Sequence, residues 1–333
     1  MGERIAFVTG GTGFLGLNLI EQLVAREWRV TALHRPASDL RSIQRFPVDL
    51  VKGDILDPQS LKRAIPQGAD AVFHLAADTS VWSRHNARQT RANVAGTRNV
   101  VAAARAARAR RVVHTSTWNT YGLEQGEISE DSPQLGGRSW INYNRTKFLA
   151  EEEVRAGIAR GLDAVILNPC HMFGRYDVHG WARLIIDVRE RWLPGVPPGA
   201  GSFCHAEQVA KAHIAAAARG RTGQNYLLGG VAASFVEVFE TIGEVTGWKV
   251  PTRPLPAFAF RLAARADAAR AALTGREPLI TPEAAAMVIA RARVVSKRAE
   301  LELGYETVPL RPMIEDCYAW LTETGRIADC ETD

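Results

Sequence analysis

Eight residues near the start of the chain, TGGTGFLG at positions 9–16, constrain the fold more than any other stretch. They follow a short apolar run, Ile5 to Val8, and lead into a segment whose apolar residues Leu17, Ile20 and Val24 share one helix face. This order predicts a strand, a tight glycine turn and an amphipathic helix. Such a turn directs the free N–H groups and the positive dipole end of the helix to one point, where a pyrophosphate can bind.

Three of the four glycines of this turn have separate roles in our interpretation. Gly10 makes the turn, Gly13 lets a ligand approach the backbone, and Gly16 lets the helix pack closely on the strand. Their GxxGxxG spacing differs from the GxGxxG fingerprint of dinucleotide-binding turns. Glycines also occur in flexible turns, but the position between a strand and a helix favours a nucleotide site. The residues expected to contact the nucleotide here are Gly10, Thr12, Gly13, Phe14, Leu15 and Gly16.

Strand and helix signals alternate over the first half of the chain. Strands are expected at 28–33, 48–51, 71–75, 111–115 and 164–167, with helices starting at Asp57 and covering 86–108 and 142–160. This alternation implies right-handed βαβ units and an α/β fold with a doubly wound, parallel Rossmann sheet. We expect residues 1–168 to form this nucleotide-binding domain, with residues 202–230 returning to it. Residues 169–201 and 231–333 are expected to form a smaller substrate-binding lobe.

Composition indicates an ordinary globular protein. The formal charge is only +5 over 333 residues, and the arginine cluster at 105–111 is interpreted as a solvated helix end. No apolar run reaches membrane-spanning length, and the first residues lack the apolar core of a signal peptide. The four cysteines are too far apart for a CxxC metal site or a disulfide framework. We therefore expect a cytoplasmic protein with no nucleic-acid partner, no membrane span and no metal.

A tyrosine and a lysine four residues apart, Tyr143 and Lys147, are candidate catalytic residues. On a helix, residues at this spacing lie on one face, so both side chains would enter the same cleft. The pKa of a free tyrosine is about 10, and a nearby ammonium, helped by an oxidised nicotinamide, would lower it. We therefore expect Tyr143 to act as a general acid or base in a carbonyl–alcohol interconversion.

Seven segments, in order along the chain, resemble the extended, epimerase/dehydratase-like short-chain dehydrogenase/reductase family. They are the glycine turn, Gly53–Ile55, Leu75–Ala77, Asn93–Thr97, Thr115–Thr117 with Tyr121–Gly122, Tyr143–Lys147 and Asn168–Gly174. The resemblance implies an NAD(P)-dependent oxidoreductase in which a hydroxyl group hydrogen-bonds the substrate oxygen. We favour Thr117 for this hydroxyl and place Ser116 second, because neighbours on a strand face opposite ways.

The resemblance also implies further contacts. Besides the glycine turn, Tyr143 and Lys147, cofactor contacts are expected from Asp54, Ile55, Leu75, Ala76, Ala77, Thr79, Asn93, Thr115, Pro169, His171 and Met172. Substrate contacts are expected from Asp78, Thr117, Trp118 and His171. The family often dimerises through the helices matching 86–108 and 142–160, so a homodimer is expected.

The end of the second expected strand predicts which cofactor binds. NAD sites place an acidic residue there for the ribose 2′-hydroxyl, but this strand ends with Leu33, His34 and Arg35. The first acidic residue, Asp39, comes later. Arg35 can instead stack on adenine and bind a 2′-phosphate with its planar guanidinium. We expect NADP(H) rather than NAD(H), with His34 and Arg35 as contacts, and keep NAD with a solvated Arg35 as the alternative.

The substrate class is less constrained. Nucleotide-sugar enzymes of this family usually carry an arginine at the position of Gly201, so this chain lacks a bidentate partner for a diphosphate. Arg175, Arg183 or Arg291 could replace it. The segment His34–Asp39 is similar to that of dihydroflavonol-reductase-like, aldehyde-reductase and hydroxysteroid-dehydrogenase branches. We favour a carbonyl reductase or alcohol dehydrogenase; the alternatives are a nucleotide-sugar epimerase or dehydratase with tightly bound cofactor, and a non-catalytic scaffold or redox sensor.

Overall fold

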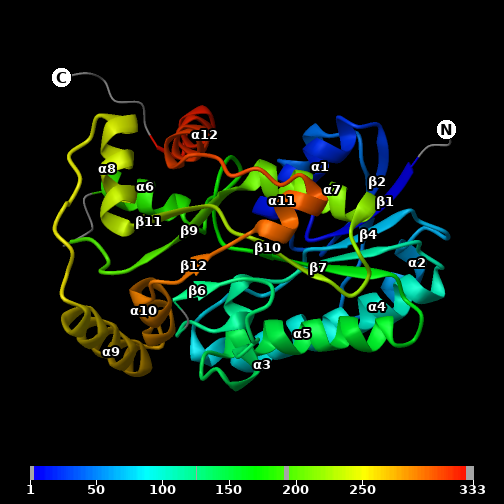
Figure 1. Cartoon of the computed structure of the whole chain (residues 1–333), viewed down its shortest axis with the longest axis horizontal. Coiled ribbons are helices and arrows are strands. Elements are labelled where there is room, and N and C mark those ends of the chain that lie inside the picture. The colour runs from blue at the N-terminus through cyan, green and yellow to red at the C-terminus, as the bar shows by residue number, and fades with distance from the viewer. Residues whose placement is uncertain (1–3, 125, 191–194, 328–333) are drawn as a thin grey trace.

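The computed structural model describes residues 4–124, 126–190 and 195–327 of the chain. At its centre is a seven-stranded sheet with the strand order β10-β7-β5-β4-β1-β2-β3 (Figure 1). Its strands are β1 (Arg4–Thr9), β2 (Trp28–His34), β3 (Asp49–Lys52), β4 (Ala71–His74), β5 (Val112–Thr115), β7 (Ala164–Pro169) and β10 (Asn225–Leu228). Every pairing in this sheet is parallel, which confirms the doubly wound Rossmann-like sheet expected from the sequence.

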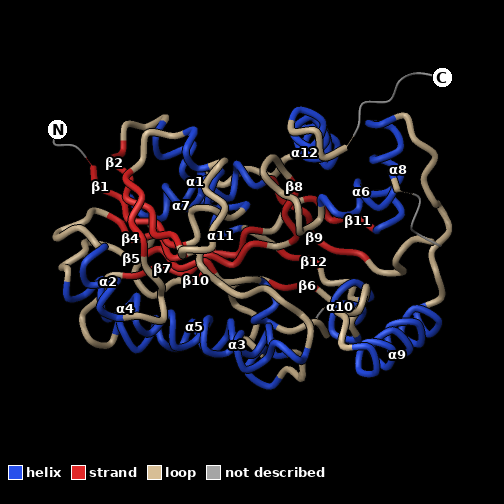
Figure 2. The backbone as a smooth tube through the Cα atoms, turned by 180° about the vertical axis from the view of Figure 1, so that it is seen from behind, coloured by secondary structure: helices blue, strands red, loops and turns tan. Residues whose placement is uncertain are grey.

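Helices cover both faces of this sheet, as Figures 1 and 2 show. One face carries α1 (Phe14–Val24) and α7 (Ala206–Arg219), which pack against each other. The other face carries α2 (Pro58–Ala64), α4 (Gly96–Ala106) and α5 (Asn142–Ile158). Because helices cover both faces, the central strands have no solvent-facing side, and every residue of β4 and β7 is buried.

The order of the strands reverses beside β1, whose neighbours are β2 on one side and β4 on the other. The chain crosses over in opposite directions from this point, so the loops after β1 and β4 diverge and leave a crevice at their carboxyl ends. The backbone N–H of Leu75 donates to the carbonyl of Thr9 at 3.1 Å and joins the two loops at their base. Doubly wound sheets bind their ligands at such a switch point.

A second, three-stranded sheet contains β8 (His171–Phe173), β9 (Ala200–His205) and β11 (Val231–Ser234). Residues 202–230 divide between the two sheets. Strand β10 belongs to the main sheet and helix α7 covers that sheet, whereas β9 belongs to the second sheet. A two-stranded pairing joins β6 (Glu127–Ile128) to β12 (Arg293–Val294). The other α-helices after β8 are α6 (Ala182–Arg189), α8 (Phe235–Thr246), α9 (Ala257–Thr274), α10 (Pro282–Ile289), α11 (Lys297–Leu303) and α12 (Leu310–Glu323).

Residues 86–108 differ from the single long helix that the sequence predicts. The structure divides them into α3 (Asn86–Thr90), a π-helical turn (Arg91–Ala95) and α4. The side chain of Asn93 lies inside this turn, where it bonds the backbone of Asp78 on the neighbouring loop. A π turn adds a residue to the helix and redirects one side chain, and such turns are frequent at functional sites.

Capping residues and prolines mark the starts of several helices. Asp57 caps α2 by accepting a hydrogen bond from the Gln59 N–H at 2.9 Å, and Ser234 and Glu237 form a reciprocal capping box. The last helix starts at Leu310 and carries Pro312 in its first turn. A proline fits in this first turn, because N–H groups there have no partner within the helix.

The cysteines of the described residues, Cys170, Cys204 and Cys317, are free and buried, and Cys330 lies outside those residues. Within the described ranges, no three or more histidine, cysteine or acidic side chains form a group that could hold a metal. None of the helices described has both the length and the apolar character needed to cross a membrane.

Buried histidines make the fold sensitive to acid. Burial lowers the pKa of His74 to about 3, and burial likewise lowers the pKa values of His171 and His213 to about 4. An unfolded histidine has a pKa of about 6.5, so below that pH the unfolded chain binds more protons and stability falls as the pH falls. Each of the three contributes about 1.4 kcal/mol per pH unit. We expect the urea midpoint to fall between about pH 7 and about pH 5; an unchanged midpoint would contradict this explanation.

Candidate active site

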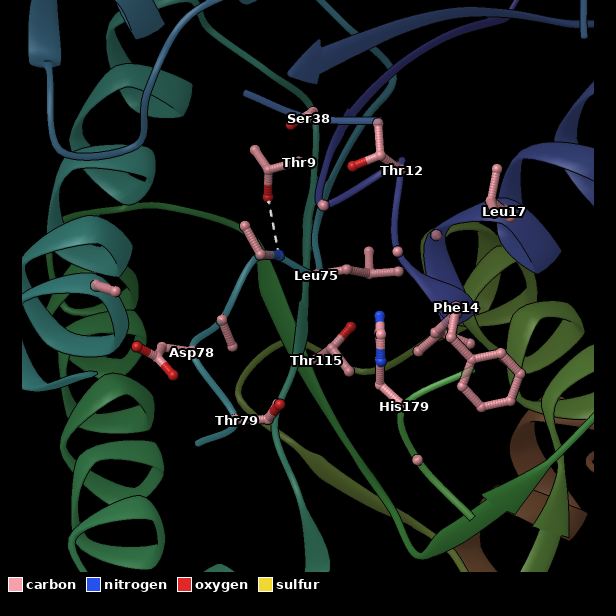
Figure 3. A pocket seen from close by; sticks show the side chains of 18 of the residues that line it. Thr9, Thr12, Phe14, Leu17, Ser38, Leu75, Asp78, Thr79, Thr115 and His179 are labelled. Carbon is pink, nitrogen blue, oxygen red and sulfur yellow. Dashed lines mark hydrogen bonds between the residues drawn. The ribbon is translucent and has the colours of Figure 1, made fainter. Parts of the chain in front are cut away.

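A cleft of about 1320 Å³ follows the carboxyl-terminal edge of the main sheet. Figure 3 shows side chains from the ends of β1, β4 and β5, from α1 and from the segment after β8 directed toward it. The predicted site residues that line it are Gly10, Thr12, Gly13, Phe14, Leu15, Gly16, His34, Arg35, Asp54, Ile55, Leu75, Ala76, Ala77, Asp78, Thr79, Thr115, Ser116, Thr117, Tyr143, Lys147, Pro169 and Met172. Segments far apart in the sequence thus meet in one cleft.

The glycine turn has the close backbone contacts expected at Gly10 and Gly16. Gly10 has a φ of +76°, and a Cβ atom there would lie 2.7 Å from the backbone nitrogen of Ala76. A Cβ atom on Gly16 would lie 2.1 Å from the carbonyl oxygen of Gly10. Gly13 caps α1 with no side-chain hydrogen bond, so no side chain of the described residues takes up the N–H groups of this first turn. The turn therefore presents free donors and a positive dipole end to the cleft.

Tyr143 and Lys147 enter the cleft from one face of α5. The Tyr143 hydroxyl is hydrogen-bonded to Thr117, which follows β5. The Lys147 ammonium donates to the carbonyl oxygen of Thr115 at 2.7 Å, and its side chain is buried. The geometry thus joins the Tyr–Lys pair to the end of β5, as the sequence predicts.

The pKa of Tyr143 differs from our expectation. Burial raises it to about 12, and only the hydrogen bond with Thr117 opposes this shift. Burial also lowers the pKa of Lys147 to about 8, against the effect of the Glu151 carboxylate. Burial, and not Lys147, therefore sets the pKa of Tyr143, which is a neutral phenol near pH 7.

The two hydroxyl candidates face opposite ways. Thr117 lies beside Tyr143, whereas Ser116 donates to the Glu151 carboxylate at 2.5 Å in the protein interior. The Ser116 hydroxyl is thus engaged by a buried carboxylate. Ser116 is therefore removed from the group of residues that could touch a substrate, although its backbone borders the cleft.

Three further predicted contacts do not belong to the cleft wall. Asn93 is buried behind it, where its side chain bonds the backbone of Asp78 and, at 3.0 Å, the hydroxyl of Thr146. His171 and Trp118 pack together with their rings 5.8 Å apart, in an aromatic cluster on the far side of β8. Alternation along β8 is the reason, because Met172 takes the side that faces the cleft. None of the three lines the cleft in the described structure, and their contacts with a ligand stay predictions.

Arg35 lies at the other end of the cleft and is exposed. Its guanidinium has no hydrogen-bond or ion-pair partner among the residues that the structure describes. Asp39 also borders the cleft, but its carboxylate binds Arg41 at 2.6 Å, and this bond lowers the pKa of Asp39 to about 2. The backbone N–H of Arg35 donates to Ser38 at 3.1 Å and fixes the turn. The acidic residue is thus occupied and the arginine is free.

Sequence reasoning missed the segment 176–181, which lines the cleft after β8. Figure 3 shows the ring of His179 directed between Leu75 and Phe14. Asp177 is buried and shapes the segment by accepting from the backbone N–H groups of His179, Gly180 and Ala182 at 3.1, 2.7 and 2.9 Å. The signal available was an aspartate followed by a histidine–glycine pair at the end of a strand, a common turn pattern.

Comparisons with known proteins agree with this architecture. A putative dihydroflavonol 4-reductase of Synechocystis is 29% identical over 96% of this chain and 95% of its own length. A 4-hydroxy-2-methyl-3-oxo-4-farnesyl-3,4-dihydroquinoline-1-oxide ketoreductase of Stigmatella aurantiaca is 35% identical over 78% of both chains. The solved structure of gox2253 has a TM-score of 0.84 and 30% identity, and covers 98% of this chain and 100% of its own.

The model of the NAD dependent epimerase/dehydratase family matches residues 6–229. This match covers about two thirds of the chain, including the glycine turn, the Tyr–Lys pair and the strands of the main sheet. The relatives of this chain include reductases and an epimerase. The chain therefore belongs to the NAD dependent epimerase/dehydratase family and is an NAD(P)-dependent oxidoreductase of the extended short-chain dehydrogenase/reductase type.

Proposed function

We propose that the protein interconverts a carbonyl and an alcohol with NADP(H), and that Tyr143 exchanges the proton. One observation carries the proposal: Tyr143, Thr117 and Lys147 meet in the same cleft that holds the glycine turn and Arg35, whose guanidinium has no partner among the described residues. The cleft can therefore hold a dinucleotide along its length, with the proton-exchanging group beside the end that reacts.

The residues of the cleft fit a dinucleotide. The close backbone contacts at Gly10 and Gly16 leave no space for side chains, and the first turn of α1 presents N–H groups that suit a pyrophosphate. Arg35 supplies a free guanidinium that suits the 2′-phosphate of NADP, whereas Asp39 is held by Arg41. When bound, the cofactor supplies or accepts the hydride.

The protein groups perform the proton exchange. Burial keeps Tyr143 as a phenol near neutral pH, and a phenol is the form that donates a proton to a reduced carbonyl oxygen. The Thr117 hydroxyl, bonded to Tyr143, orients the same oxygen. The Lys147 ammonium, held by the Thr115 carbonyl, brings a positive charge into the same cleft.

The arginines that could have bound a sugar diphosphate are engaged elsewhere. Arg175 lies 3.5 Å from Glu21, Arg183 bonds Asp187 at 2.6 Å, and Arg291 donates to a backbone carbonyl. None of the three lines the cleft in the described structure. The names of the relatives, a reductase and a ketoreductase, also favour net carbonyl reduction over an epimerase.

A panel of ketones and aldehydes, assayed by loss of NADPH absorbance, tests the function. We expect turnover of at least one carbonyl with net consumption of NADPH. Interconversion of a nucleotide sugar without net consumption of cofactor would favour the epimerase or dehydratase, and cofactor binding without any turnover would favour the scaffold or sensor.

The variant Arg35→Ala should change the cofactor preference. Loss of charged hydrogen bonds to the 2′-phosphate should raise the Kd of NADPH roughly 10- to 100-fold and leave that of NADH nearly unchanged. Fluorescence titration with both cofactors measures this. Arg29→Ala is the matched control, because Arg29 lies on β2 and its guanidinium is paired with the carboxylate of Asp49. Tighter binding of NADH than NADPH by the wild type would contradict the cofactor assignment.

Location and assembly are further parts of the proposal. We propose a cytoplasmic homodimer formed through α4 and α5, as the family resemblance implies. Leu149 on α5 is 39% exposed and offers an apolar contact for such an interface. Sedimentation of the purified protein tests this arrangement, and a monomer at micromolar concentration would contradict it.

A further inference from the structure

The carboxylate of Glu151 lies in the interior, one helical turn beyond Lys147 on α5, and its side chain is fully buried. It accepts hydrogen bonds at Oε1 from Ser116 at 2.5 Å and Asn168 at 2.7 Å, and at Oε2 from Gln134 at 2.8 Å, Arg155 at 3.0 Å and Asn225 at 3.0 Å. A buried carboxylate is costly unless such bonds compensate for the loss of water. All five donors converge on one group, which indicates a specific role for it.

The hydrogen bond from Ser116 fixes the backbone that Lys147 contacts. Ser116 follows Thr115, whose carbonyl oxygen accepts the hydrogen bond of the Lys147 ammonium at 2.7 Å. The Ser116 hydroxyl is anchored to Glu151, and its backbone N–H donates to β7 at 2.7 Å. The chain next to the Thr115 carbonyl is therefore fixed on two sides.

The hydrogen bond from Asn168 fixes Thr117, the residue that Tyr143 contacts. Asn168 donates both to Glu151 and, at 3.0 Å, to the carbonyl oxygen of Thr117. The hydroxyl of Thr120 donates to the same carbonyl at 3.0 Å. Because the Thr117 hydroxyl bonds Tyr143, Glu151 acts through Asn168 on the position of that hydroxyl.

Glu151 is also the anion that acts on the Lys147 ammonium. The other titratable groups that interact with Lys147 are His74 on β4 and His114 on β5, and burial holds both of their pKa values far below neutrality. They carry no charge near pH 7. Glu151 favours the ammonium form, whereas burial lowers the pKa of Lys147 to about 8. Removal of this carboxylate therefore leaves burial unopposed.

We propose that Glu151 is a positioning residue of the active site: its hydrogen bonds to Ser116 and Asn168 fix the segment 115–117, whose Thr115 carbonyl holds Lys147. The effect on turnover rests on the proposed function. The effect on the lysine charge does not, because it is read from cofactor binding alone.

The test compares wild type with three variants: Glu151→Gln, Ser116→Ala and Glu153→Gln. Glu153 is the matched control, because it lies on the same helix but pairs with the exposed Arg98 at 2.6 Å. For each protein, the Kd of NADPH is measured by fluorescence as a function of pH, and kcat/KM is measured over the same range with a ketone that the wild type reduces. Thermal unfolding monitors the fold.

We expect Glu151→Gln to lower the alkaline midpoint of both profiles by about one pH unit. Ser116→Ala should reduce kcat/KM roughly 10-fold without moving the midpoint, because it loosens the segment but keeps the charge. Glu153→Gln should match wild type. A folded Glu151→Gln protein with the wild-type midpoint in both profiles would overturn the proposal.

Two further outcomes, an unfolded Glu151→Gln variant and a wild type that reduces no carbonyl, still test the proposal. If Glu151→Gln does not fold, Ser116→Ala decides, and a wild-type kcat/KM in that variant overturns the positioning role. If wild type reduces no carbonyl, the proposed function fails, and the pH dependence of NADPH binding in Glu151→Gln still supports or overturns the role of Glu151.

Discussion

Replacing Tyr143 with phenylalanine should reduce kcat by about 10²- to 10⁴-fold, the range typical of a lost general acid or base. The phenol is the group of the cleft placed to give a proton, since its hydroxyl is bonded to Thr117 and its neighbour Lys147 is held by Thr115. The Kd of NADPH should stay within about twofold of wild type, because phenylalanine keeps the ring and removes only the hydroxyl. Single-turnover kinetics and fluorescence titration measure the two quantities.

Tyr318→Phe is the control for this variant. Tyr318 lies on α12, where its ring packs edge-on against Trp248 at 5.6 Å, and it does not line the cleft in the described structure. We expect its kcat to equal that of wild type. Retention of more than about a tenth of wild-type activity by Tyr143→Phe would remove Tyr143 from the proton-exchanging role.

Replacing Gly16 with alanine should lower stability strongly. The added Cβ atom would lie 2.1 Å from the carbonyl oxygen of Gly10 and 2.7 Å from the Cα atom of Gly11. Both are backbone atoms of the glycine turn, so the turn itself must move to make room. Overpacking typically costs about 1–3 kcal/mol, and we expect a loss of about 3 kcal/mol or more here. Urea unfolding measures the loss, and NADPH titration should show that binding is abolished.

Gly126→Ala provides the comparison, because a Cβ atom there meets nothing within 4 Å. Its free energy of unfolding should change by less than about 0.5 kcal/mol. A wild-type urea midpoint and normal NADPH binding in Gly16→Ala would contradict the close packing of α1 on the glycine turn.

The elements of the sheet were predictable because their signals are local. The glycine turn at Gly10, the proline after the Asp57 cap and the buried apolar runs each depend on residues a few positions apart. The Tyr143–Lys147 pair was predictable for the same reason, since both residues lie on one helix at a spacing of four. The cleft then follows from the parallel order of the strands.

What the local sequence does not show is the direction of side chains whose orientation depends on distant partners. Asn93 turns inward because its amide finds the backbone of Asp78, and His171 packs on an aromatic cluster because strand alternation places Met172 toward the cleft. The pKa of Tyr143 was also misjudged, because burial depends on segments that the local sequence does not bring together. Glu151 repeats the four-residue spacing of the pair and could have been found from it.

The central claim is net reduction of a carbonyl by NADPH with Tyr143 as the proton donor. The most direct test incubates the wild-type protein with a ketone and NADPH that carries deuterium on the transferable position of nicotinamide C4. We predict that the alcohol product gains one deuterium for each NADPH consumed, and that Tyr143→Phe forms almost none. Conversion of a nucleotide sugar with no loss of label from the cofactor, or equal labelled product from Tyr143→Phe, would contradict the account.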